Sequence, residues 1–255
     1  EGQGASFYGS APTFDEAPRL WSKIYDMRAL GEGARFSCFY PLRETETPCA
    51  ELRASQERLT PAAHVIQFGR SDFETLLTMP AALAYFDEFF PIDDIYHLPA
   101  NLSEVPFEPY DRGMKLPRSE EIELTSHLAA FMWRALAARG ADDRPVRTRE
   151  RLIVVVPAAD MNGEMESMRR LLWLCLKALP LCMRKKLSVK LNADANAAEL
   201  PPDSAVYFCH VGKGGGEVRH TGVVFDLENG EYPRAEEAVC QYLRARLSGD
   251  EMPLN

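Results

Sequence analysis

The sequence lacks the features that identify secreted, membrane and nucleic-acid-binding proteins. Its six cysteines form no C-x-x-C pair, so zinc ribbons and thioredoxin-like redox sites lack their signature. No apolar stretch approaches the roughly 18 residues that a membrane-spanning helix needs. Asp and Glu number 38 against 29 Lys and Arg, which gives a formal net charge of -9. A chain this acidic is a poor candidate for sequence-independent nucleic-acid binding, which needs a basic surface.

Motifs of known catalytic sites are absent as well. The G-x-S-x-G elbow, the kinase glycine loop, H-E-x-x-H, and the H-x-E with P-C-x-x-C pattern of deaminases do not occur. Lys213 to Gly216 reads KGGG, but the strand-like EVRHTGVVF follows it. A phosphate loop needs a helix N-terminus at that point. We therefore expect a hairpin tip over Gly212 to Glu217, and no cofactor.

The composition is that of a globular protein: 46% of residues are hydrophobic and 26% are charged. A chain of 255 residues can bury a sizeable core without disulfide or metal staples. Cys175, Cys209 and Cys240 lie in apolar segments and are predicted to be small core residues. His64 and His127 are likewise predicted to be buried, hydrogen-bonded histidines rather than catalytic bases. The sparse cysteines fit a reducing cytoplasm.

The second half shows the clearest secondary-structure patterns. Ser119 predicts the start of a helix that runs to about Arg139. Leu152 to Val156 reads LIVVV, a β-branched run typical of a strand covered on both faces. Further predicted elements are a helix over 163–179, strands over 187–191, 205–211 and 218–227, and a helix from Pro233. This order predicts an α/β (mixed α+β) fold in which helices flank a mixed sheet.

The charges of that last predicted helix follow its dipole. Glu236 and Glu237 lie in its first turn, and Arg244 and Arg246 lie near its end. Negative charge is favourable near a helix N-terminus and positive charge near its C-terminus. The sequence therefore predicts a dipole role for all four residues.

The first half is predicted to be a smaller α+β region. Strands are expected over 35–42 and 63–68, a helix from the S-x-x-E capping box at Ser71, and another over 81–90 after Pro80. The stretch 91–117 contains five prolines, which disfavour helix and central strand alike. We therefore predict two regions, 1–112 and 113–255.

Acidic and aromatic residues alternate around that proline-rich stretch. From Asp87 through Asp111 the sequence has seven acidic residues, no Lys or Arg, and aromatics that include Phe89, Tyr96 and Tyr110. One interpretation is a linker whose aromatic side chains pack on the body of the protein. The other is a docking strip for a basic partner.

Asp160, Asn162 and Glu164 follow the predicted buried strand. Ligands of open α/β sheets bind beyond the carboxyl ends of strands, and oxygen ligands at that place suit Mg²⁺. The competing interpretation is ordinary helix capping, with the acidic side chains favoured in the first turn.

Arg184, Lys185 and Lys186 form a basic run at a predicted corner between a helix and a strand. If the corner is structural, the Arg184 guanidinium is expected to donate to helix C-terminal carbonyls or to pair with a nearby carboxylate. If the run is a binding patch for an acidic protein or a phosphate, Arg184 should be exposed.

The same corner resembles a known family. Leu179-Pro180, then Arg184, then Leu187-Ser188 are similar to the L-P-x-x-x-R-x-x-L-S-F element of bacterial GTPase-associated proteins. Tyr8-Gly9 and Ala63-His64-Val65 are compatible with their N-terminal region. After Ser188 the sequence departs from the pattern, because it continues with Val, Lys and Leu where the family tends to have Phe, Ser or Thr, and Tyr.

The resemblance implies an accessory or adaptor role beside a GTPase system and transfers no catalytic residue. We expect a cytoplasmic, non-enzymatic regulatory or scaffold module of a signalling or conflict system. Its expected partner is a protein, such as a component of that GTPase system, rather than nucleic acid or a membrane. The alternative is an enzyme of unfamiliar type with an acidic, Mg-dependent site near Asp160.

Overall fold

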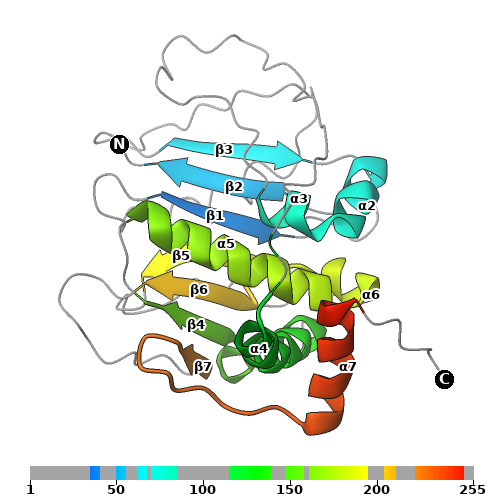
Figure 1. Ribbon diagram of the computed structural model, residues 1–255. Helices are drawn as coiled ribbons and strands as arrows, with labels where there is room; N and C mark the ends of the chain where they lie inside the picture. The colour runs from blue at the N-terminus through cyan, green and yellow to red at the C-terminus, as the bar shows by residue number, and fades with distance from the viewer. Residues whose placement is uncertain are drawn as a thin grey trace.

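Seven strands form one mixed sheet with the order β3-β2-β1-β5-β6-β4-β7 (Figure 1). The computed structural model describes residues 35–40, 50–55, 62–67, 70–85, 115, 117–138, 147–157, 161–194, 204–210 and 222–249. The strands are β1 (Arg35–Tyr40), β2 (Ala50–Ser55), β3 (Ala62–Gln67), β4 (Leu152–Val156), β5 (Val189–Asp194), β6 (Val206–His210) and β7 (Val223–Asp226). The helices are α2 (Arg70–Thr78), α3 (Pro80–Ala84), α4 (Ser119–Ala138), the 3-10 turn η2 (Thr148–Glu150), α5 (Met161–Ala178), α6 (Leu181–Arg184) and α7 (Glu237–Ser248).

The sheet has a parallel part and an antiparallel part. The strands β5, β6, β4 and β7 are parallel neighbours, and the helix α5 connects β4 to β5. The strands β1, β2 and β3 form an antiparallel meander, and β1 pairs antiparallel with β5. The predicted α/β fold is thereby confirmed. The sheet continues across the predicted boundary at residue 112, and the division into two regions stays a prediction.

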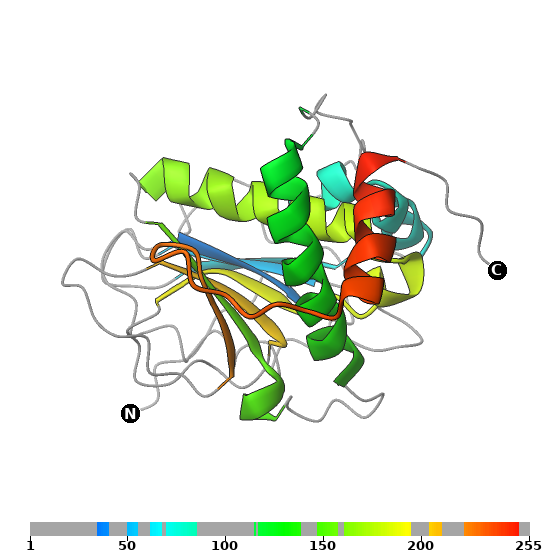
Figure 2. The ribbon, with the colours of Figure 1, turned by 60° about the horizontal axis from the view of Figure 1, so that its bottom comes forward.

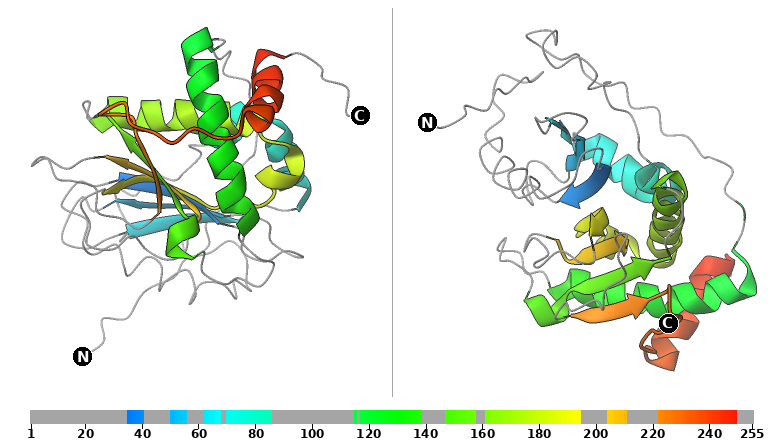
Figure 3. Two further views of the ribbon diagram at one scale, coloured as in Figure 1. Left: turned by 90° about the horizontal axis from the view of Figure 1, so that it is seen from below. Right: turned by 90° about the vertical axis from the view of Figure 1, so that its left-hand side faces the viewer.

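The helices α4, α5 and α7 lie on one face of the sheet (Figures 2 and 3). Val154 of β4 and Phe208 of β6 belong to the apolar core that these helices cover. Ile153 and Tyr207 belong to a second buried cluster, on the other face of the same strands. Alternate residues of a strand point to opposite faces, and every residue of β4 is buried. Both faces of this strand are therefore covered. The prediction of a strand covered on both faces is confirmed.

The elements that differ from the sequence-based expectation include β2, α3 and α7. The strand β2 reads AELRAS and was not predicted, because it has no β-branched or aromatic residue. The helix α3 ends at Ala84, before the predicted end at Phe90. The helix α7 begins at Glu237 rather than Pro233, because Glu236 has an extended backbone. In the segment before the helix, the Ala235 amide donates to His127.

No helix in the described ranges is both long enough and apolar enough to cross a membrane. The predicted hairpin tip over 212–217 lies outside the described residues.

Phe208 tests the core beneath the helices. Its side chain is fully buried in the middle of β6. We expect Phe208→Ala to lower the free energy of unfolding by about 3–5 kcal/mol, through lost burial and the cavity that remains. Leu181→Ala, at a side chain that is 43% exposed, should change it by less than about 0.5 kcal/mol. Urea unfolding followed by circular dichroism measures both, and equal losses would contradict the described packing.

Candidate functional site

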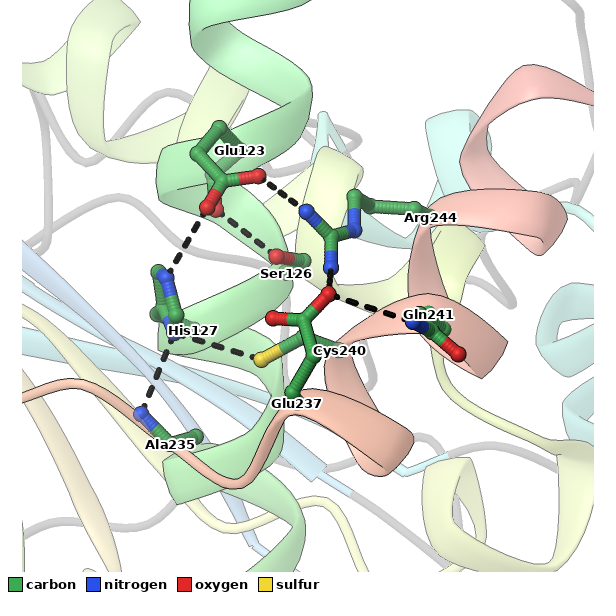
Figure 4. Close-up of polar contacts among 8 residues, drawn as sticks. All are labelled: Glu123, Ser126, His127, Ala235, Glu237, Cys240, Gln241 and Arg244. Carbon is green, nitrogen blue, oxygen red and sulfur yellow. Dashed lines mark hydrogen bonds and ion pairs between the residues drawn. The ribbon is translucent and has the colours of Figure 1, made fainter.

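The helices α4 and α7 enclose a cluster of polar side chains (Figure 4). Glu123, Ser126 and His127 come from one side of α4, at positions i, i+3 and i+4. The helix α7 contributes Glu237, Cys240 and Arg244, at positions i, i+3 and i+7 of one side of that helix. Two helices far apart in the sequence therefore place a carboxylate, an imidazole and a thiol side by side.

His127 lies at the centre of this cluster and is 4% exposed. Its Nδ1 accepts the Ala235 amide proton at 3.1 Å, so the proton of the neutral ring is on Nε2. That Nε2 lies 3.2 Å from Glu123 Oε1 and donates to it. The Cys240 Sγ lies 3.2 Å from the same Nδ1. Every polar atom of the imidazole thus has a partner.

The Glu123 carboxylate that contacts the ring is also paired with a cation, Arg244. Arg244 bridges the carboxylates of Glu123 and Glu237. Burial by itself would raise the pKa of Glu123, but the Arg244 charge and the hydrogen bonds from Arg244 and His127 lower it below the ordinary value. Burial raises the pKa of the Cys240 thiol, against a smaller opposing effect of a hydrogen bond with Ser126. Cys240 is therefore a neutral thiol at pH 7.

A carboxylate, an imidazole and a thiol in this sequence of contacts are the parts of a cysteine nucleophile with its base and orienting group. Two observations oppose that role. The Ala235 amide already occupies the Nδ1 lone pair that a base needs, and the Cys240 side chain has no exposed surface. The contacts instead join α4 to α7 and to the chain that enters α7. The prediction that His127 and Cys240 are buried, partnered residues is confirmed.

A second polar cluster lies at the C-terminal end of α5. The last carbonyls of a helix have no partner within the helix. The Arg184 guanidinium donates to two such oxygens, from Nε to Leu179 O at 3.0 Å and from Nη2 to Lys177 O at 3.3 Å. Its Nη1 donates to Leu77 O of α2 at 2.8 Å. The predicted contact of Arg184 with helix C-terminal carbonyls is confirmed, and the side chain is 7% exposed.

Arg246 of α7 reaches the same helix end. Its Nε donates to Ala178 O at 2.7 Å and its Nη2 to Leu179 O at 3.4 Å. Burial, and then the nearby Arg246 charge, lower the pKa of Arg184 to about 10. Two cations thus complete one helix terminus through neutral carbonyls. The sequence predicted for Arg246 only a role at the end of its own helix.

The other predicted binding residues are only partly placed. Lys185 is exposed and lies 3.9 Å from Glu74 of α2, and Lys186 is half-buried. Whether they bind a partner stays a prediction. Phe89, Tyr96 and Tyr110 lie outside the described residues.

Of the predicted Mg²⁺ ligands, Asp160 lies outside the described residues. Asn162 and Glu164 lie in the first turn of α5, which follows β4, and nothing is described of their side chains. Within the described ranges, no group of three or more His, Cys, Asp or Glu side chains could hold a metal ion. The metal site stays a prediction.

His210 lies near the place where that site was predicted. It ends β6, in register with Val156 at the end of β4. Its Nδ1 is buried and has no hydrogen-bond partner among the described residues. The strands β5, β6, β4 and β7 are parallel, so the ends of β4 and β6 lie at the carboxyl edge of this part of the sheet. Ligands of open α/β sheets bind beyond that edge.

Sequence reasoning missed the partners of His127. The spacing of Glu123, Ser126 and His127 on one helix was a usable signal for a polar stripe. No local pattern pairs that stripe with Glu237 and Arg244, which lie more than 100 residues later.

The comparisons with known proteins find no relative for this chain: no family model, no curated protein and no solved structure matches it.

Arg184 should be a strong contributor to stability. We expect Arg184→Ala to lower the free energy of unfolding by about 1–3 kcal/mol, because it removes the donors of three carbonyls. Arg184→Lys should lose part of this, since an ammonium cannot reproduce the planar fork. Lys185→Ala should have almost no effect, because its ion pair is exposed. Denaturant unfolding checks this order, and an unchanged Arg184→Ala variant would contradict it.

The two nitrogens of His127 can be tested separately. In His127→Asn, the asparagine Oδ1 takes the place of the imidazole Nδ1 and can accept the Ala235 amide proton. In His127→Gln, the glutamine Nε2 takes the place of the imidazole Nε2, so only the donor to Glu123 is kept. The Glu123 carboxylate is half-exposed and also pairs with Arg244, so losing its imidazole donor costs less. We expect both variants to be less stable than the unchanged chain. The free energy of unfolding of His127→Gln should be lower than that of His127→Asn by about 1 kcal/mol or more. Thermal unfolding at pH 8 measures the difference, and the reverse order would contradict the assigned tautomer.

Proposed function

We propose that this chain is a non-enzymatic regulatory or scaffold module that binds a protein partner in a bacterial GTPase-associated signalling or conflict system. It acts in the cytoplasm, and its partner is a component of the GTPase system rather than nucleic acid or a membrane. The acidic net charge of -9 agrees with a protein partner.

The observation that carries the proposal is the structural use of the L-P-x-x-x-R-x-x-L-S residues. Leu179 and Leu187 are buried in the core, and Arg184 closes the end of α5. Ser188 is buried, and its Oγ accepts the Ala205 amide at 3.3 Å. Because these residues are buried or hydrogen-bonded within the protein, a resemblance at these positions favours a shared fold. A shared fold supports, by analogy only, a shared adaptor role.

The chemically capable side chains support the same proposal. The Glu123–His127–Cys240 contacts occupy the imidazole and bury the thiol, so this cluster serves packing between helices. In this cluster the described residues therefore offer no reactive group to a substrate, which agrees with a protein that acts by binding through its surface.

The second candidate is an enzyme of unfamiliar type with an acidic, Mg-dependent site near Asp160. One observation favours it: the buried His210 Nδ1 has no hydrogen-bond partner within the described ranges, and it lies at the carboxyl end of β6, beside the strand that precedes Asp160. A general base or metal ligand at the sheet edge would have this position.

Affinity purification followed by calorimetry distinguishes the two candidates. We expect the tagged full chain to retain a protein encoded beside a GTPase gene, and the purified pair to bind with 1:1 stoichiometry. Asp160→Asn and His210→Gln should leave this binding unchanged. In parallel, phosphoester, phosphoanhydride and carboxylic ester substrates are incubated with the chain and Mg²⁺. Turnover that both variants abolish would overturn the module and establish the enzyme.

A further inference from the structure

Positive charge gathers where α5, α6 and α7 meet, although the chain as a whole is acidic. Figure 1 shows α6 beside the ends of α5 and α7. Arg184 and Arg246 both donate to the last carbonyls of α5. We call this place the basic corner and define it by its cations and one apolar residue: Lys177, Arg184, Lys185, Lys186, Arg246 and Leu181.

The two arginine charges of the basic corner have neutral partners. Among the described residues, both guanidinium groups donate to backbone carbonyls, and the C-terminus of a helix carries only about half a negative charge. The Arg246 charge disfavours the charged form of Arg184. Within the described part of the chain, the positive charge of the basic corner is therefore not fully compensated, and a carboxylate brought close would be attracted to it.

The surface above these arginines is basic and apolar. Leu181 is 43% exposed, and it is the one large apolar side chain that is exposed among the described residues. Lys185 follows it by one helical turn, at position i+4. Lys185 has one acidic neighbour, Glu74, at 3.9 Å, and both side chains of this pair are about half exposed. Such a pair contributes little and is easily exchanged for another partner.

We propose that the basic corner is the docking surface for an acidic protein segment that places a large apolar side chain on Leu181 and carboxylates on Lys185 and Lys186. This inference rests on the proposed function, whose partner it describes. The geometry favours a peptide over a phosphate. Bidentate phosphate recognition uses the guanidinium fork, and the described hydrogen bonds of both forks go to backbone carbonyls. A free phosphate would also leave Leu181 without a contact.

The probe is a fluorescent 14-residue peptide of Glu with two Leu, and binding to the full chain is followed by anisotropy. We expect binding that weakens as salt rises, because exposed charges are screened. Lys185→Ala with Lys186→Ala should weaken it by roughly tenfold, and so should Leu181→Ser. The matched control removes two exposed positive charges elsewhere, in Arg134→Ala with Arg149→Ala, and should leave the affinity within about twofold.

Each other outcome overturns the docking surface. Equal losses in the two double variants would show general attraction of an acidic peptide. Tighter binding of inorganic polyphosphate than of the peptide, lost in the same lysine variant, would make the corner a phosphate site. Absence of peptide binding would remove the basis of the inference. If the retained GTPase-system protein binds the lysine variant as well as it binds the unchanged chain, the module stands and only this surface is wrong.

Discussion

The arrangement of the helices depends on one buried cation. The C-terminal oxygens of α5 cannot be satisfied within the helix, and they lie where α2, α6 and α7 converge. Arg184 supplies donors to two of them and to Leu77 O of α2. Burying a guanidinium is costly unless it is hydrogen-bonded. The bonds to these carbonyls offset that cost and fix where α2 packs. Through Arg246, the same helix end also fixes α7.

The contact between α4 and α7 follows the same logic with an imidazole in place of the guanidinium. His127 accepts the Ala235 amide and donates to Glu123, so one side chain joins two helices and the start of α7. Because the ring is buried and fully partnered, it specifies this packing rather than offering a base. In both clusters a residue type common in active sites has a structural role.

Local patterns gave the central elements. The LIVVV run predicts β4, and the helices predicted over 119–139 and 163–179 match α4 and α5 within two residues at each end. These elements are long or strongly biased, so intrinsic preference and burial agree. The strand β2 has neither property, and its place is set by pairing with β1 and β3. The predicted start of α7 at Pro233 is wrong, although proline suits a first helical turn. Glu236 has an extended backbone, and the segment before it is joined to α4 by the Ala235–His127 hydrogen bond.

The candidate sites divide in the same way. The sequence by itself determined that Arg184 follows the end of a helix, since Pro180 stops α5. It left open whether the guanidinium contacts helix C-terminal carbonyls or a carboxylate, or belongs to an exposed binding patch, and the structure decided for the carbonyls. The sequence also predicted that His127 and Cys240 are buried, because both lie within predicted helical segments rich in apolar residues. Only the tertiary structure decided that these two meet, that Arg246 completes another helix rather than its own, and that Leu181 stays exposed above the cations. The physical reason is that helical spacing fixes which residues share a face, whereas the partner of each face is chosen by packing between segments more than 60 residues apart.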